Sequence, residues 1–161
     1  MDLLDRLLGH DGWTTRQLLT LADALSDEQL DRQFAIGHRT LRRTFLHVIH
    51  NMEVWSALLA GDSVDAPDAA TDALITAMTA RLDAAAARLA IVATSVRDRS
   101  DWDGRWVDPF DGAEKTYGSG IAHVLTHSMH HRAQILYMLR LVGVAVLPEG
   151  DVLSWESQMA T

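Results

Sequence analysis

Residues Gly120–Val142 have the sequence GIAHVLTHSMHHRAQILYMLRLV, which is the segment most informative about the fold of this chain. Its apolar residues recur at the spacing of an amphipathic helix rather than in the alternation of a strand. On a wheel of about 100° per residue, Val124, Ile135 and Met138 form one stripe. His131 falls inside that stripe. The segment is therefore predicted to be a helix that turns a histidine toward a buried face.

The rest of the chain has the same helical periodicity, and only three prolines interrupt it. Further long helices are predicted over Leu3–Leu25, Thr40–Gly61 and Ala69–Ser95, with a linker over Asp62–Pro67. A glycine such as Gly61 is a natural helix terminator. We therefore predict an all-α fold, a four-helix bundle forming a single domain over residues 1–161.

The helical pattern fails from Arg97 to Ser119. Asp-Gly and Asp-Pro dipeptides supply turn chemistry there, and Trp102, Trp106 and Phe110 are candidate anchors. This segment is predicted to be a long loop before the fourth long helix. Loops of such length are often functional lids or binding loops, although a loop held down by its aromatic residues is an equal alternative. The tail after the fourth helix, which carries Trp155, is expected to pack back on the bundle.

Composition excludes several kinds of chemistry. The chain has 161 residues and no cysteine, so it cannot form a disulfide, a thiolate metal site or a cysteine nucleophile, and any metal must be held by nitrogen or oxygen. A net charge of -8 argues against a nucleic-acid partner, because phosphate binding needs a basic surface. No secretion signal and no bilayer-spanning apolar run is apparent, so a soluble, cytoplasmic protein without a membrane partner is expected.

The histidines are the candidate functional residues, and four of the eight lie between residues 123 and 131. His127 lies about 40° from His131 and one turn earlier, the i, i+4 geometry by which a helix offers two nitrogens to one ion. On the second long helix, His47 shares the inward face with Asn51 and Val54. Three inward imidazoles predict a divalent-metal site with open coordination positions. The alternative is that these histidines are core residues satisfied by hydrogen bonds.

Two motifs carry a resemblance to a known family. The fourth-helix sequence His127-Ser-Met-His-His131-Arg-Ala-Gln134 looks like the signature His-x-x-x-His-Arg-Gly-Gln, with Ala133 in place of glycine. The second helix places a histidine eight residues before a tryptophan, in His47-Val-Ile-His-Asn-Met-Glu-Val-Trp55, and the first helix carries Trp13. Over essentially its whole length the chain resembles the DinB/YfiT-like metal-binding four-helix bundles.

The resemblance implies that His47, His127 and His131 are the metal ligands and that the ion is nickel, zinc or another divalent metal. It also implies that the helices follow an up-down-down-up order and that the protein forms a homodimer, as is frequent in the family. Family members with known activity include thiol S-transferases that use bacillithiol or mycothiol and a mycothiol-dependent maleylpyruvate isomerase. The expected function is therefore a metal-dependent transferase that joins a low-molecular-weight thiol to a small-molecule substrate. A metal-dependent hydrolase and a non-enzymatic metal-binding or stress-response protein are the alternatives.

Two further histidines are candidates for catalysis as a general base or for orienting a ligand. These are His10, on the first helix near Trp13, and His123, one turn before His127. His50 and His130 lie at the margins of the predicted site. Because only neutral imidazole binds metal, affinity is expected to fall as the pH drops through about 6.5.

Overall fold

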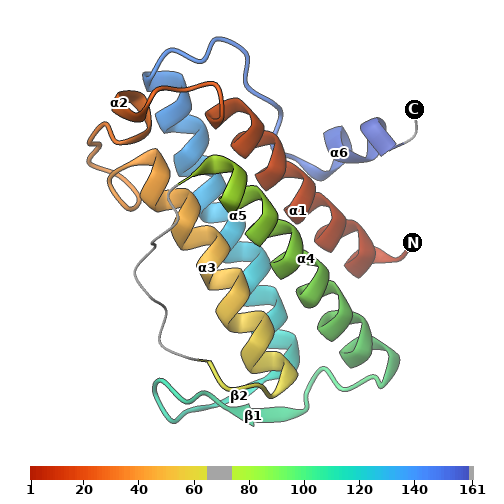
Figure 1. Cartoon of the computed structure of the whole chain (residues 1–161). Helices are drawn as coiled ribbons and strands as arrows, with labels where there is room; N and C mark the ends of the chain where they lie inside the picture. The colour runs from red at the N-terminus through yellow and green to blue at the C-terminus, as the bar shows by residue number, and fades with distance from the viewer. Residues whose placement is uncertain (65–73, 160–161) are drawn as a thin grey trace.

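Four long helices form the centre of the molecule in the computed structural model, which describes residues 1–64 and 74–159 (Figure 1). They are α1 (Leu3–Ala22), α3 (Leu41–Ala60), α4 (Ile75–Asp98) and α5 (Tyr117–Leu141). Two short helices, α2 (Asp27–Leu30) and α6 (Val152–Met159), precede α3 and follow α5. The predicted all-α bundle is confirmed.

The order of the helices around the bundle is also as expected. α3 packs against α4 and α5, and α1 packs against the same two helices, so α1 and α3 lie on a diagonal. In Figure 1, α1 and α5 run in one direction while α3 and α4 run in the other. The bundle is therefore up-down-down-up, and α3 and α5, which carry the predicted ligands, are antiparallel neighbours. Among the described residues, no helix has the length and apolarity needed to cross a membrane.

The helix ends follow local capping chemistry. α3 begins after the N-cap Thr40, whose side chain accepts from the Arg43 amide, and ends at Gly61 in the left-handed conformation (φ 80°), as predicted. α1 ends at Ala22 rather than Leu25, because the capping box of Ser26 starts the separate helix α2. α5 begins three residues before the expected Gly120, at Tyr117.

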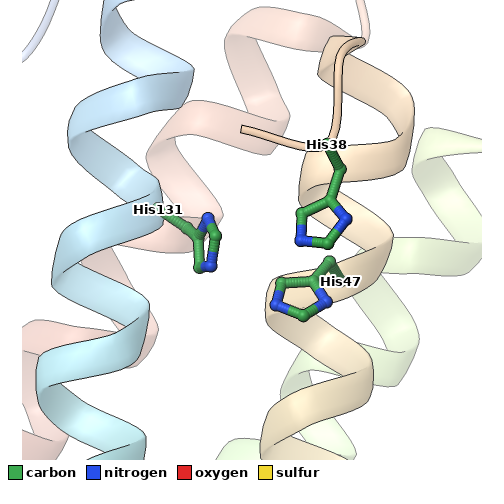
Figure 2. A group of neighbouring side chains, drawn as sticks. All are labelled: His38, His47 and His131. Atoms are coloured by element: carbon green, nitrogen blue, oxygen red, sulfur yellow. The ribbon is translucent and has the colours of Figure 1, made fainter. Parts of the chain in front are cut away.

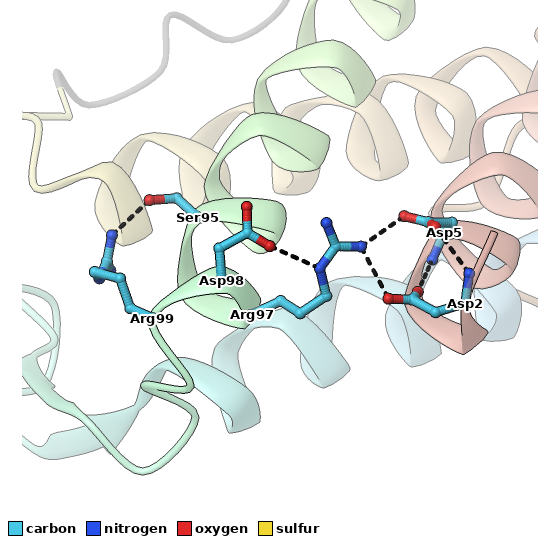
Figure 3. A network of polar contacts seen from close by, with 6 residues as sticks. All are labelled: Asp2, Asp5, Ser95, Arg97, Asp98 and Arg99. Atoms are coloured by element: carbon cyan, nitrogen blue, oxygen red, sulfur yellow. Dashed lines mark hydrogen bonds and ion pairs between the residues drawn. The ribbon is translucent and has the colours of Figure 1, made fainter.

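α4 extends beyond its expected end at Ser95 to Asp98. The added residues include Arg97, whose polar contacts are drawn in Figure 3. The Arg97 guanidinium donates from Nη1 to Asp2 and Asp5, both at 2.9 Å, and so ties the end of α4 to the start of α1. The expected start of this helix at Ala69, and the linker residues from 65 onward, lie outside the described residues. The described helix starts at Ile75, after the extended Leu74.

The segment between α4 and α5 is not the irregular loop that was predicted. Strand β1 (Arg105–Val107) pairs with β2 (Glu114–Thr116) in an antiparallel hairpin, with Trp106 opposite Lys115. The predicted turn residues fit this hairpin. Its strands were not predicted because three residues are too few to show the alternation of apolar and polar residues that identifies a strand. Trp102 and Trp106 pack against the core as expected, whereas Phe110 is 63% exposed and is not an anchor.

The tail packs back on α1 through Trp155, which is 4% exposed and belongs to α6. The close approach is possible because residue 9 is glycine: a Cβ there would lie 2.6 Å from Cζ2 of Trp155. Gly12, on the same helix, has room, since a Cβ would lie 3.4 Å from the Ala86 methyl. The structure thus confirms the expected packing of the tail.

These two glycines provide a matched pair of substitutions. Gly9→Ala is expected to be destabilising relative to Gly12→Ala by about 1–3 kcal/mol, because only the first overpacks an indole while both gain helix propensity. Urea unfolding of the two variants measures the difference. Equal stabilities would show that Trp155 does not pack on Gly9 in solution.

Candidate metal centre

The three predicted ligands meet in the interior between α3 and α5. His47 Nε2 lies 3.0 Å from His127 Nε2. The His131 ring centroid lies 4.7 Å from that of His47 and 4.5 Å from that of His127. His131 is 8% exposed, in the apolar stripe where the helical wheel placed it. The structure therefore brings the three imidazoles together, while their role as ligands stays a prediction.

A fourth imidazole, His38, joins this group from the turn between α2 and α3. Its ring stacks on that of His47, with centroids 3.7 Å apart and planes inclined by 28°. Figure 2 shows the two rings one above the other, facing His131 across the space between the helices. One nitrogen from each of His38, His47 and His131 can be chosen so that all lie within 4.8 Å of one another. We call His38, His47, His127 and His131 the histidine cluster.

Sequence reasoning missed His38 because a helical wheel ranks only residues inside a helix. The available signal was its position two residues before Thr40, the N-cap of the helix that carries His47. A residue just before a helix can fold back over the first turns of that helix. That placement alone would not have fixed the direction of the side chain.

The amide of Gln134 fixes the orientation of His131. Gln134 Oε1 lies 2.7 Å from His131 Nδ1, and Gln134 Nε2 lies 2.9 Å from His130 Nε2. Since the amide oxygen can only accept, Nδ1 of His131 carries the proton and its Nε2 lone pair is free. This is the outer hydrogen bond by which proteins orient a metal-ligating histidine.

The pKa values of the cluster favour neutral rings. Desolvation, followed by repulsion from the neighbouring imidazoles, lowers the pKa of His47 to about 3 and that of His127 to about 4. Desolvation also lowers the pKa of His131 and of His38. Neutral imidazole is the form that binds metal. Because these pKa values are lowered, protons should compete with a metal ion for the ring nitrogens only below the pH of about 6.5 at which an ordinary histidine titrates.

The nitrogens that converge on one point in the described residues belong to His38, His47 and His131, and His127 joins this group through His47. Two nitrogens that bind one ion at about 2.0–2.1 Å lie roughly 3.0–3.4 Å apart. The 3.0 Å separation of the Nε2 atoms of His47 and His127 is within that range. His127 Nδ1 is buried without a protein hydrogen-bond partner among the described residues, so the hydrogen bond of His127 Nε2 to His47 is what orients the ring. His38, His47 and His131 could together hold an ion, and His127 lies beside them.

Without metal, the protein is expected to lose stability as the pH falls from about 6.5 toward 4. In the unfolded chain these histidines bind protons near pH 6.5, whereas the folded pKa values of His47 and His127 are about 3 and about 4. Between those limits the unfolded state binds more protons, so a falling pH favours unfolding. Urea unfolding of the metal-free protein at several pH values measures the slope.

The control for this slope is His47→Phe, which keeps a ring but cannot bind a proton. Its stability should depend less steeply on pH over the same range, because one of the groups with a lowered pKa is gone. The carboxylates contribute equally to both proteins. Parallel pH profiles would contradict a lowered pKa of His47.

His123 and His10, the candidate catalytic residues, occupy different places. The His123 ring lies 5.4 Å from that of His127 and 4.5 Å from the Trp55 ring, so it flanks the cluster. His10 Nε2 lies 2.9 Å from the carbonyl oxygen of Gly150 in the C-terminal segment. Among the ring contacts of the described residues, none joins His10 to the cluster. A catalytic role for either residue stays a prediction.

Beyond His123, an aromatic surface links the cluster to the hairpin. Trp55 of α3 meets Trp106 of β1 edge to face at 5.7 Å, and the Lys115 ammonium lies 5.3 Å from the Trp55 ring centroid. Asp108, which is 3% exposed, pairs with Lys115 and so fixes the lysine on the hairpin. Aromatic rings and a lysine that is paired with Asp108 and Asp111 therefore flank the cluster on the side of His123.

Comparison with known proteins agrees with this reading of the fold and motifs. A search of curated proteins found no match to the chain. The model of the DinB family matches residues 1–158. That match spans all four long helices and the histidines between them, so the chain belongs to the DinB family.

Proposed function

We propose that the protein is a metal-dependent S-transferase that joins a low-molecular-weight thiol to a small electrophilic substrate. The observation that carries this proposal is the convergence of the histidine cluster, in which the pKa values of His47 and His127 are about 3 and about 4. His131 is buried but His38 is exposed, so the cluster extends from the interior to the surface. Because the chain has no cysteine, the sulfur must come from a separate thiol.

The proposed ion is zinc or nickel, held by His47, His127 and His131. When bound, such an ion is a Lewis acid that lowers the pKa of a thiol, so that a thiolate is available at neutral pH. Imidazole nitrogens suit both metals. Gln134 keeps His131 in the tautomer whose Nε2 lone pair is free.

His123 is the proposed base. Its ring lies beside His127, and desolvation, with the nearby charge of Lys115, lowers its pKa, so it is neutral near pH 7. In the proposed reaction the S–H proton passes to this imidazole, the sulfur forms a bond to the electrophilic carbon, and the leaving group departs with its electron pair. Trp55, which lies 4.5 Å from His123, offers a ring face to the substrate.

The experiment is a conjugation assay with purified protein loaded with zinc or nickel. Bacillithiol, mycothiol and glutathione are each offered with a panel of alkyl halides, epoxides and maleylpyruvate, and products are identified by mass spectrometry. We expect a product that requires both the ion and the thiol, and that is lost in His47→Ala. His50→Ala is the control, because His50 Nδ1 lies 3.7 Å from Glu53 Oε2 and His50 takes no part in the proposed reaction.

The other outcomes separate the alternatives. Turnover of esters or amides without added thiol would replace the transferase by a hydrolase. Tight metal binding with no turnover of either kind would contradict an enzymatic function and favour a binding protein. Loss of conjugation in His123→Gln, with metal binding kept, would support the base, whereas unchanged conjugation would remove it. The expected homodimer is tested separately, by sedimentation of the full chain.

A further inference from the structure

His38 differs from the other three members of the histidine cluster in how it is held. His47, His127 and His131 belong to long helices, whereas His38 lies in a turn and is exposed. Within the part of the chain that is described, no hydrogen bond is made by its side chain, and its ring contacts are with His47 and His131. Its ring face lies against His47, and a nitrogen of His38 lies within 4.8 Å of nitrogens of His47 and His131, so a rotation of this exposed side chain would bring that nitrogen to an ion bound there.

The turn around His38 is built in an uncommon conformation. Gly37 and Arg39, on either side of it, both have left-handed backbones, with φ of 58° and 72°. For a residue such as Arg39 this conformation is strained and persists where surrounding contacts require it. The Arg39 carbonyl accepts from Phe34 at 2.7 Å, and the His38 amide donates to Thr44 Oγ1 at 3.2 Å. These bonds hold the turn over His47.

We propose that His38 is a fourth, exchangeable ligand of the ion held by His47, His127 and His131. The proposal rests on the proposed function, because it concerns the same ion. His38 fills one coordination position in the resting protein, and it is the ligand that a small thiol replaces. The S–H proton of the thiol would pass to His123, the base of the proposed reaction, and the His38 imidazole would turn toward solvent.

The manner of attachment explains why His38 is the ligand that leaves. Moving His47, His127 or His131 away from the ion would disturb packed helices, and His131 is also bound to Gln134. The exposed side chain of His38 can rotate toward solvent without disturbing the core. Structural metal sites have all four positions closed by protein, whereas catalytic sites keep one available. An exchangeable histidine closes the site at rest and opens it to the thiol.

The experiment uses the full chain loaded with cobalt(II), whose visible absorption reports coordination. Wild type is compared with His38→Ala and with His38→Phe, which keeps the ring stacked on His47 but has no nitrogen. The matched control is His50→Ala. We expect the Kd for cobalt(II) to rise at least about tenfold in both His38 variants, as even loss of an outer partner of a ligand weakens binding 10–100-fold. The visible bands should change in both variants and not in the control.

A titration with 2-mercaptoethanol then tests the exchange, through the sulfur-to-cobalt absorption band. If His38 holds its position about 90% of the time, its removal should make the thiol bind about tenfold more tightly. The thiol should therefore bind more tightly to His38→Ala than to wild type. If His38 instead helped to bind the thiol, the thiol would bind more weakly to His38→Ala than to wild type.

Each remaining outcome counts against a defined part of the account. An unchanged cobalt Kd in both His38 variants would overturn the inference and leave the proposed function intact. Weaker cobalt binding without tighter thiol binding would overturn the exchange. Wild-type protein that binds no cobalt, zinc or nickel would overturn the proposed function itself. Circular dichroism of the metal-free His38 variants should show that the fold is kept, because His38 is exposed.

Discussion

Replacing His131 with alanine is expected to weaken the binding of zinc or nickel by about 100-fold or more, because the loss of even an outer partner of a ligand costs 10–100-fold. His131 is the best held member of the cluster: it is 8% exposed, and Gln134 fixes its tautomer. An ion present at 100 times its Kd stabilises the folded protein by about 2.7 kcal/mol. The variant should lose most of that stabilisation at the same concentration of ion, keeping about 0.4 kcal/mol or less.

The measurement is urea unfolding with and without zinc, for wild type, His131→Ala and His50→Ala. The quantity to compare is the increase in free energy of unfolding that zinc produces, because His131→Ala also changes the packing of α5 in the metal-free state. His50→Ala should keep the whole increase. A His131→Ala protein that keeps it as well would rule this residue out as a ligand.

Removing Arg132 is expected to destabilise the fold by about 3–5 kcal/mol, the effect of leaving one partner of a buried ion pair without the other. Arg132 of α5 is 4% exposed and Asp11 of α1 is 2% exposed, and the two form a salt bridge. Burial raises the pKa of Asp11, against the lowering effect of Arg132. In Arg132→Met the Asp11 carboxyl would lose its counter-charge, and α5 would lose one of its contacts with α1.

Arg16→Met is the matched control, since Arg16 also links α1 to another helix through an aspartate, Asp83 on α4. Both side chains are more than 40% exposed, and such pairs contribute less than about 1 kcal/mol. The double variant Asp11→Leu with Arg132→Met should recover most of the lost stability, because it removes both buried charges. If Arg132→Met costs no more than Arg16→Met in urea unfolding, the buried pair does not hold α5 to α1.

The sequence was sufficient for the long helices because their signals are local. Thr40 and Gly61 mark the ends of α3 by capping chemistry alone, and both ends were predicted correctly. The inward direction of His47 and His131 follows from helix periodicity, which depends only on residue spacing. The order of the helices around the bundle was predicted from the family resemblance and not from residue spacing.

The structural features that the sequence did not predict depend on tertiary structure. The strands of the hairpin have three residues each and are stabilised by pairing and by Trp106 packing on the bundle, which no local pattern shows. His38 reaches the cluster through a turn whose backbone angles are set by hydrogen bonds to Phe34 and Thr44. Phe110 was expected to be buried because it is aromatic, but it lies at the exposed end of the hairpin.

The most direct test of a metal centre built from histidines is X-ray absorption at the zinc edge of the zinc-loaded protein. We expect one ion per chain with three or four imidazole nitrogens at about 2.0–2.1 Å, and the outer scattering typical of imidazole rings. His47→Ala should remove that signal. A protein that retains no zinc, or whose zinc has mainly carboxylate oxygen neighbours, would contradict the account.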